Sequence, residues 1–226
     1  MRIEYVKYST SRATRYRICT MILHDGKTRK VRKSAALPQA KAHIKRVIEN
    51  TARIGAQAVG LEVPACYPVG DALEMPFVEG QTLEGLLVEA ALNGDASAVG
   101  QVVDRYAELV RAQPRVQADP GGWPDFGEWF GESLGTEDCL KLGQVDLIFE
   151  NIIAAPEGRL YNIDCEWLCD APIPVNYVLH RAVRVLYLHH QKVLEPVMDA
   201  KAMRARLGIR EEEMQSYVLW DKRFDD

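Results

Sequence analysis

The sequence predicts a mixed α+β protein, with strands in its first 80 residues and mainly helices after them. Polar and apolar residues alternate between positions 5 and 33, and residues 24–27 (His-Asp-Gly-Lys) form a strong hairpin-turn signal. Apolar residues recur at helical spacing in later segments such as 99–113. Between the later helices, residues 143–167 have the pattern of two apolar strands joined by a turn, and three polar residues interrupt this hairpin. We expect the chemistry to be concentrated in that hairpin.

Composition and charge exclude several classes of protein. The chain has 226 residues, of which 47% are apolar and 27% are charged, as in ordinary soluble domains. A net charge of −4 gives no reason to expect a nucleic-acid partner. No run approaches 18 apolar residues and the first residues do not begin a signal peptide, so we expect no transmembrane segment and a cytoplasmic location.

The five cysteines have no framework spacing and are expected to be reduced thiols. Cys165 and Cys169 lie four positions apart, which is only weak evidence for zinc.

The N-terminal elements are predicted from the alternation of polar and apolar residues and from the glycine and proline residues at their ends. Strands are expected at 5–8, 16–23 and 28–34, then a helix at 38–54 that starts at a proline and stops at Gly55. Short strands are expected at 59–63 and 65–67. A further strand at 73–78 precedes a glycine and a helix capped by Thr82.

The C-terminal part is predicted to be helical at 82–92, 99–113 and 175–188. Residues 114–137 are rich in Gly, Pro and Trp, and their aromatic residues form either an acceptor-site wall or the anchors of a long loop. His189 and His190 follow the last of these helices. As neighbours on a helix they should point to different faces and should not share one metal ion. The charged tail, 200–226, either packs as helix or contacts another molecule.

Three polar residues stand out in the 143–167 hairpin: Asp146, Asn151 and Asp164. A buried carboxylate without a partner costs several kcal/mol, so acids at strand ends often bind a metal or take part in chemistry. The plain alternative is a β-hairpin with two surface acids and a turn asparagine.

The spacing Asp146-x-x-x-x-Asn151, with Asp164 in the later segment Ile-Asp-Cys-Glu-Trp (163–167), resembles the catalytic segment of the protein kinase-like superfamily. The form of the second motif looks like the aminoglycoside phosphotransferase and choline kinase branch. The resemblance covers about residues 25 to 190. It implies a two-lobed fold: a small β-rich N-lobe over residues 1–80 with a hinge at 74–80, and a mainly helical C-lobe over 81–226.

The resemblance also implies an ATP-dependent phosphotransferase that acts on a small-molecule or glycan hydroxyl. Asp146 would position the attacking hydroxyl, Asn151 and Asp164 would bind Mg²⁺, and Lys33 would contact the α- and β-phosphates of ATP. The remaining nucleotide-site candidates are Glu49 as the helix partner of Lys33, Ser11 and Arg12 at the phosphates, and the backbone of Met75 and Phe77 at the adenine. The plain alternatives are a surface lysine, an exposed helix glutamate and an ordinary strand.

Two departures from the family leave activity open. Gln144 and Val145 precede Asp146 where the family has His-Gly, and the turn at 9–13 contains no glycine. Moreover, only about 60 residues follow Asp164, which leaves little room for a substrate-binding subdomain. The alternatives are therefore a pseudokinase that binds nucleotide or acts as a scaffold, and an unrelated α+β binding protein.

A closer resemblance concerns residues 8–12, 163–167 and 172–176. The sequences of these segments are similar to those of kinase-like domains that are attached to bacterial glycosyltransferases or methyltransferases of surface-polysaccharide assembly. This likeness implies a saccharide-end hydroxyl as the acceptor, and association with a glycosyltransferase or other assembly proteins.

Overall fold

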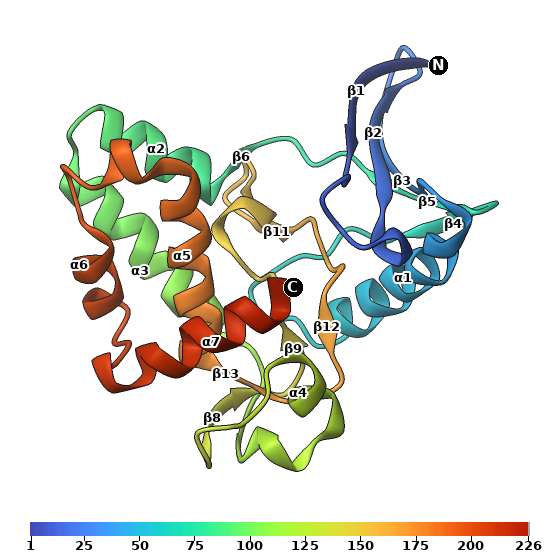
Figure 1. Cartoon of the computed structure of the whole chain (residues 1–226). Coiled ribbons are helices and arrows are strands. Elements are labelled where there is room, and N and C mark those ends of the chain that lie inside the picture. The colour runs from blue at the N-terminus through green and yellow to red at the C-terminus, as the bar shows by residue number, and fades with distance from the viewer. Residues whose placement is uncertain (226) are drawn as a thin grey trace.

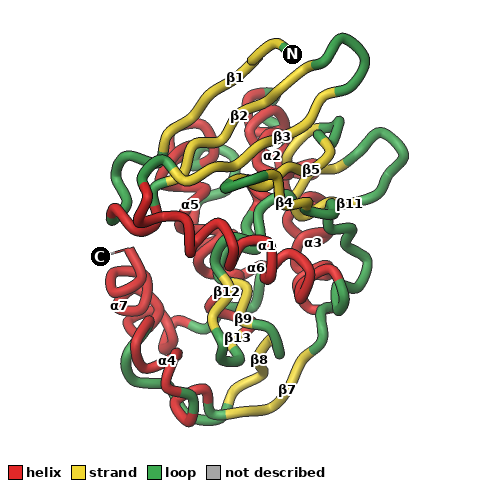
Figure 2. Tube along the Cα trace, turned by 90° about the vertical axis from the view of Figure 1, so that its right-hand side faces the viewer, coloured by secondary structure: helices red, strands yellow, loops and turns green. Residues whose placement is uncertain are grey.

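A five-stranded antiparallel sheet and one long helix form the N-terminal part of the computed structural model, which describes residues 1–225 (Figure 1). In order across the sheet, the strands are β1 (Arg2–Tyr8), β2 (Ile18–His24), β3 (Arg29–Ala35), β5 (Ala72–Pro76) and β4 (Tyr67–Val69). The alternation in 5–33 thus produces the predicted strands, and the turn between β2 and β3 is tied by Asp25, whose carboxylate accepts from two backbone N–H groups. The tube view in Figure 2 shows the long β1–β2–β3 meander.

Helix α1 (Lys41–Gly55) packs against this sheet, after a short 3₁₀ turn at Pro38–Ala40. The helix predicted at 38–54 buries one apolar stripe: Ile44 and Val47 pack with Ile18, Leu73 and Met75 in one small core. The expected strands at 59–63 and 65–67 are largely wrong, because that stretch contributes one isolated bridge at Glu62 and then β4. Pro64 and Gly60, which has a φ of +65°, favour an irregular connection over a regular strand pair.

The C-terminal part is built on helices around one large apolar core. Its helices are α2 (Leu83–Leu92), α3 (Ala96–Ala112), α4 (Pro124–Trp129), α5 (Val175–Leu194), α6 (Ala200–Arg206) and α7 (Met214–Asp225). Thr82 caps α2 as predicted, its hydroxyl accepting from the N–H of Gly85. The charged tail packs on the same molecule as α6 and α7, and α7 brings the C-terminus back to the middle of the structure (Figure 1).

Short strands connect the helices, and some of them belong to the segment 143–167 that carries Asp146, Asn151 and Asp164. They form three small sheets: β6 (Gln81–Thr82) with β10 (Ile152–Ala154) and β11 (Leu160–Asn162), β9 (Gly143–Gln144) with β12 (Leu168–Cys169), and β7 (Arg115–Ala118) with β8 (Glu137–Leu140) and β13 (Ile173–Pro174). The β10–β11 hairpin has the predicted turn, where Gly158 adopts a φ of +87°. Residues 147–149, expected in the first strand of the hairpin, instead form a loop that enters a 3₁₀ turn, Phe149–Asn151.

The protein is therefore mixed α+β, with a sheet-rich N-terminal part and a helical remainder, as predicted. All five cysteines are free thiols. None of the helices in residues 1–225 combines the length and apolar character needed to cross a bilayer.

Candidate active site

Lys33 and Asp164 form the ion pair around which the candidate site is built. Lys33 lies in the middle of β3, where its neighbours in the sheet are Thr20 and Leu73, and its side chain is buried. Its Nζ lies 2.7 Å from Oδ2 of Asp164, which follows β11. Burial favours the neutral amine, but the charges of Asp164 and then Glu166 outweigh it and raise the pKa of Lys33. The lysine is therefore a fixed cation in the interior.

Asp146 and Asn151 lie in the loop that precedes β10. The side-chain N–H₂ of Asn151 donates to the backbone carbonyl of Asp146 over 3.0 Å, which closes this loop and leaves the amide oxygen of Asn151 for another partner. The backbone carbonyl of Asn151 accepts from the N–H of Ile163, next to Asp164. The two predicted motifs, 12 to 18 positions apart along the chain, are thus joined by hydrogen bonds.

The carboxyl groups of the site influence one another. Burial raises the pKa of Asp146; Arg181 opposes this, while the negative charges of Asp164 and Glu166 add to it. The guanidinium of Arg12 is subject to the charges of Glu166, Asp164 and Asp146 together, and its pKa is raised against the effect of burial. The carboxylates of Asp146, Asp164 and Glu166 therefore share one region with the cations of Lys33, Arg12 and Arg181, and such clusters of charges that shift one another's pKa are typical of functional sites.

Glu166 anchors this region to the N-terminal part, a role that the sequence analysis did not assign. Its carboxylate is only 2% exposed; it accepts from the guanidinium of Arg12 and lies 2.5 Å from Nε2 of His43 on α1. Its backbone is held as well, because its N–H donates to Asp164 and its carbonyl accepts from Asn50. Burial alone would raise the pKa of Glu166, but His43 and Arg12 outweigh it and lower the pKa to about 2.

Glu49 does not lie at the site. It is exposed on α1, and within residues 1–225 the ion pair made by Lys33 is with Asp164. The predicted Lys33–Glu49 pair is therefore not formed in this structure. Glu49 lies on the outward face of α1, so it cannot reach Lys33. His43 and Asn50 lie on the inward face of this helix and contact Glu166 instead.

The turn between β1 and β2 reaches the site through one residue. Arg12 points inward, to Glu166 and over the ring of Trp167 at 5.6 Å, whereas Ser11 is exposed. Trp167 in turn contacts the rings of Tyr16 and His43 at centroid distances of 4.9 and 5.3 Å. Side-chain packing and one ion pair thus fix this turn, which has no glycine.

At the predicted hinge, Met75 is buried in the small core and pairs with Val31 across the sheet. The N–H of Phe77 donates to the carbonyl of Arg29 over 3.2 Å, and Pro76 has no N–H. Pro76 and Phe77 therefore offer no free backbone donor to adenine. The ring of Phe77 lies under the guanidinium of Arg29 at 4.2 Å.

Arg181 is a second residue that the sequence analysis missed. It is buried on α5 and donates from Nε to Oδ1 of Asp146 over 3.2 Å and from Nη1 to Oδ1 of Asp221 over 2.9 Å. Asp221 belongs to α7 and is 1% exposed. A signal existed: an arginine four positions after Tyr177 lies on the apolar face of a strongly apolar helix, where a charge needs a partner.

The aromatic residues of 114–137 mostly anchor their own loop. Phe126 and Phe130 are buried in the large core, whereas Trp129 is half-buried and contacts Trp167 and Phe224 at 6.1 and 5.6 Å. Trp123 is exposed. Of these four aromatic residues, Trp129 is therefore the one that contacts the 163–167 segment, through Trp167.

Comparison with solved structures identifies the fold. An aminoglycoside-3′-phosphotransferase of type VIII is similar over 97% of this chain and 94% of that chain, with 19% identity and a TM-score of 0.54. An aminoglycoside phosphotransferase from Streptomyces rimosus matches at 14% identity, over 97% of this chain and 92% of that one, with a TM-score of 0.49. A choline kinase from Streptococcus pneumoniae matches at 12% identity, over 99% and 83% of the two chains, with a TM-score of 0.48.

No protein-family model matches the sequence, and a search of curated proteins finds no match. The first of these structures, together with the observed topology, shows that this chain has the protein kinase-like fold in the form of the aminoglycoside phosphotransferases, as the motifs predicted.

Proposed function

We propose that the protein is an ATP-dependent phosphotransferase that acts on a hydroxyl group of a small molecule or saccharide. The observation that carries the proposal is the ion pair between buried Lys33 and half-buried Asp164. The backbone next to Asp164 is hydrogen-bonded to Asn151, and the Asn151 side chain is hydrogen-bonded to the carbonyl of Asp146. On this fold, that arrangement suits a polyphosphate with its divalent cation.

Each residue of the site has a proposed role. Asn151 and Asp164 would hold Mg²⁺, because a carboxylate and an amide oxygen are the hard ligands that this cation prefers. Lys33 would contact the α- and β-phosphates. Asp146 would accept a hydrogen bond from the acceptor hydroxyl and orient it towards the γ-phosphate, and would take its proton as transfer proceeds. The bound cation would supply neutralisation of the phosphate charge.

Arg12 and Glu166 extend the site on the N-terminal side. Arg12 would add a positive charge beside the phosphates, and it is held in place by Glu166. Ser11, Met75 and Phe77 remain candidates for nucleotide contacts. Of these, Phe77 would contribute its ring or its carbonyl, because its N–H is already bonded. The division into lobes at residue 80 also remains a prediction.

The acceptor is proposed to be a saccharide-end hydroxyl, in association with a glycosyltransferase or other assembly proteins in the cytoplasm. What supports this is the sequence likeness in residues 8–12, 163–167 and 172–176. The alternative, a pseudokinase that binds nucleotide as a scaffold, is favoured by Gln144 and Val145 before Asp146 and by the glycine-free turn.

A transfer assay separates these two functions. Purified protein with MgATP is incubated with a panel of mono- and disaccharides, amino sugars and choline, and transfer of the γ-phosphate is followed by release of ADP and by mass spectrometry. The proposal expects one class of acceptor to be phosphorylated, and expects the Asp146→Asn variant to lose transfer while it still binds ATP. Nucleotide binding without transfer to any acceptor or to water would favour the scaffold.

A further inference from the structure

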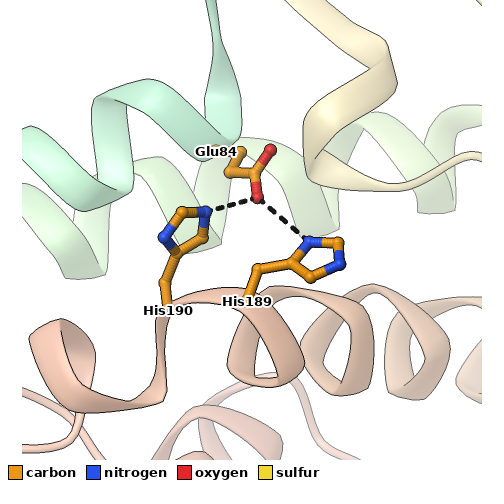
Figure 3. A group of neighbouring side chains, drawn as sticks. All are labelled: Glu84, His189 and His190. Carbon is orange, nitrogen blue, oxygen red and sulfur yellow. Dashed lines mark hydrogen bonds and ion pairs between the residues drawn. The ribbon is translucent and has the colours of Figure 1, made fainter. Parts of the chain in front are cut away.

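Three metal-ligating side chains converge outside the candidate active site (Figure 3). Glu84 lies in the first turn of α2, and His189 and His190 lie near the end of α5. Oε1 of Glu84 is 2.7 Å from Nε2 of His190 and 3.7 Å from Nδ1 of His189. One potential ligand atom from each residue lies within 4.8 Å of the other two.

A break in α5 makes this convergence possible. Neighbouring residues on a regular helix are about 100° apart, so the sequence predicted that the two histidines would diverge. That prediction is wrong because His190 has φ −128° and ψ 19°, which lie outside the helical range. The backbone turns at this residue, and both rings reach the same carboxylate, with their planes at 85° to each other.

We propose that Glu84, His189 and His190 form a binding site for a divalent transition-metal ion of the zinc type. Two imidazoles and one carboxylate are a common set of three protein ligands for zinc, with water or another molecule in the fourth position. Bond lengths of about 2.0–2.2 Å place the ligands of a tetrahedral ion roughly 3.4 Å apart. The observed 2.7 and 3.7 Å from Glu84 to the two histidines bracket that spacing, and the two histidine nitrogens lie within 4.8 Å of each other, so a small approach of the rings would complete the geometry.

The donor set separates this site from the proposed magnesium site. Mg²⁺ prefers oxygen ligands and keeps much of its water, whereas imidazole nitrogen favours zinc and its neighbours in the series. The site is also open to entry, because the His189 side chain is 46% exposed and the Glu84 side chain 17% exposed. An ion can thus reach the histidines from solvent and meet a carboxylate that the fold already holds in place.

The position suggests what the ion would do. Glu84 follows β6, and β6 pairs with β10, the strand that starts immediately after Asn151. Glu150, just before Asn151, lies in the 3₁₀ turn Phe149–Asn151, which packs against both α2 and α5. The ion would cross-link α2 to the end of α5 and add a positive charge beside this loop.

Zinc titration of the protein tests the proposal. The full chain is first treated with a chelator and dialysed, and Zn²⁺ is then titrated by calorimetry and by thermal unfolding. We expect one Zn²⁺ per chain, a rise in Tm with Zn²⁺ concentration, and binding weakened at least about tenfold in His189→Ala and in His190→Ala. Co²⁺ should give the visible absorption of a low-coordinate site in wild type, and that absorption should be lost in both variants.

Two controls isolate the site. His24→Ala removes a histidine that also faces a glutamate, Glu4 at 3.6 Å, but that has no third metal ligand beside it within residues 1–225, and this variant should bind Zn²⁺ as wild type does. Asp164→Asn should likewise keep Zn²⁺ binding, which separates this ion from the nucleotide site. Should His190→Ala not fold, Glu84→Gln replaces it. Absence of saturable Zn²⁺ binding to wild type, or equal affinity and stoichiometry in wild type and the His189→Ala/His190→Ala double variant, would overturn the proposal and leave an ordinary histidine–glutamate contact.

Discussion

Arg181 of α5 donates to Asp146 across 3.2 Å, and the same guanidinium is held by Asp221 of α7 at 2.9 Å. The residue proposed to orient the acceptor is thus connected, through one arginine, to the last helix of the chain. The ring of Phe224 lies under that guanidinium at 4.4 Å and restricts it further. The C-terminal helix therefore belongs to the support of the candidate site.

Removal of the Arg181 charge should change the pH dependence of transfer. Asp146 must be ionised to accept the hydroxyl proton; burial raises its pKa and Arg181 opposes that rise. In Arg181→Met the pKa of Asp146 should rise further, so the acid limb of the kcat/KM profile should move to higher pH by about one unit. Arg184→Met, which removes a neighbouring arginine that contacts Asp225 and Asp221, is the control. An unchanged acid limb in Arg181→Met would contradict the assignment of Asp146.

The ion pair between Arg181 and Asp221 should matter for stability. Asp221 is 1% exposed, and removing it leaves a buried guanidinium with fewer partners. We expect Asp221→Ala to lower the free energy of unfolding by about 3–5 kcal/mol. Asp225 contacts the same arginine at 3.4 Å but its side chain is 41% exposed, so Asp225→Ala should cost at most about 1 kcal/mol. Urea unfolding of the two variants measures the difference, and similar losses would argue against a structural role for the buried pair.

Glu166 should contribute stability that depends on pH. Its pKa falls from the ordinary value of 4.5 to about 2 in the folded protein, so its ionised form favours folding above about pH 5. This contribution, about 3 kcal/mol, should be lost as the pH falls from 4.5 to 2. The stability difference between wild type and Glu166→Gln should therefore shrink over that range.

Unfolding by urea at several pH values tests this expectation, with Glu62→Gln as a control because Glu62 is exposed. A stability difference between wild type and Glu166→Gln that stays constant down to pH 2 would show that the carboxylate charge is not what stabilises the fold.

Lys33 and Glu49 should behave differently, although the family pattern pairs them. Lys33 is buried against Asp164, whereas Glu49 is exposed. Lys33→Met should weaken ATP binding by at least about tenfold, through loss of the cation at the phosphates. Glu49→Ala should leave ATP affinity unchanged and stability within about 0.5 kcal/mol. Equal losses of ATP affinity in both variants would show that α1 rearranges when nucleotide binds.

The motifs allowed the fold to be predicted from the sequence because they keep their order along the chain. Asp146, Asn151 and Asp164 have a fixed spacing, and the alternation in 5–33 and the stripe on α1 report burial directly. The strand prediction for 147–149 was wrong because burial alone does not distinguish a strand from a loop. A buried loop carries the same apolar residues as a buried strand, and its backbone groups are satisfied by particular contacts such as Asn151 to Asp146.

The supporting contacts of the site could not be read from the sequence. Arg12 and Glu166 are 154 positions apart, His43 and Glu166 are 123 apart, and Arg181 and Asp221 are 40 apart. One sequence does not reveal such pairings: the apolar face of α5 indicates that Arg181 is buried, but only the fold shows which acids it contacts. The break of α5 at His190 is similar: the sequence predicted that the helix ends at residue 188, whereas α5 continues to Leu194 with non-helical backbone angles at His190.

The most direct test of the proposed function is calorimetric titration of ATP, with and without Mg²⁺, into wild type and Asp164→Ala. Glu49→Ala serves as a control, because it removes an exposed carboxylate that does not contact the candidate site. The proposal predicts saturable binding of ATP that is strengthened by Mg²⁺ in wild type and in Glu49→Ala, and loses its Mg²⁺ dependence in Asp164→Ala. The absence of ATP binding to wild type, or equal Mg²⁺ dependence in Asp164→Ala, would contradict it.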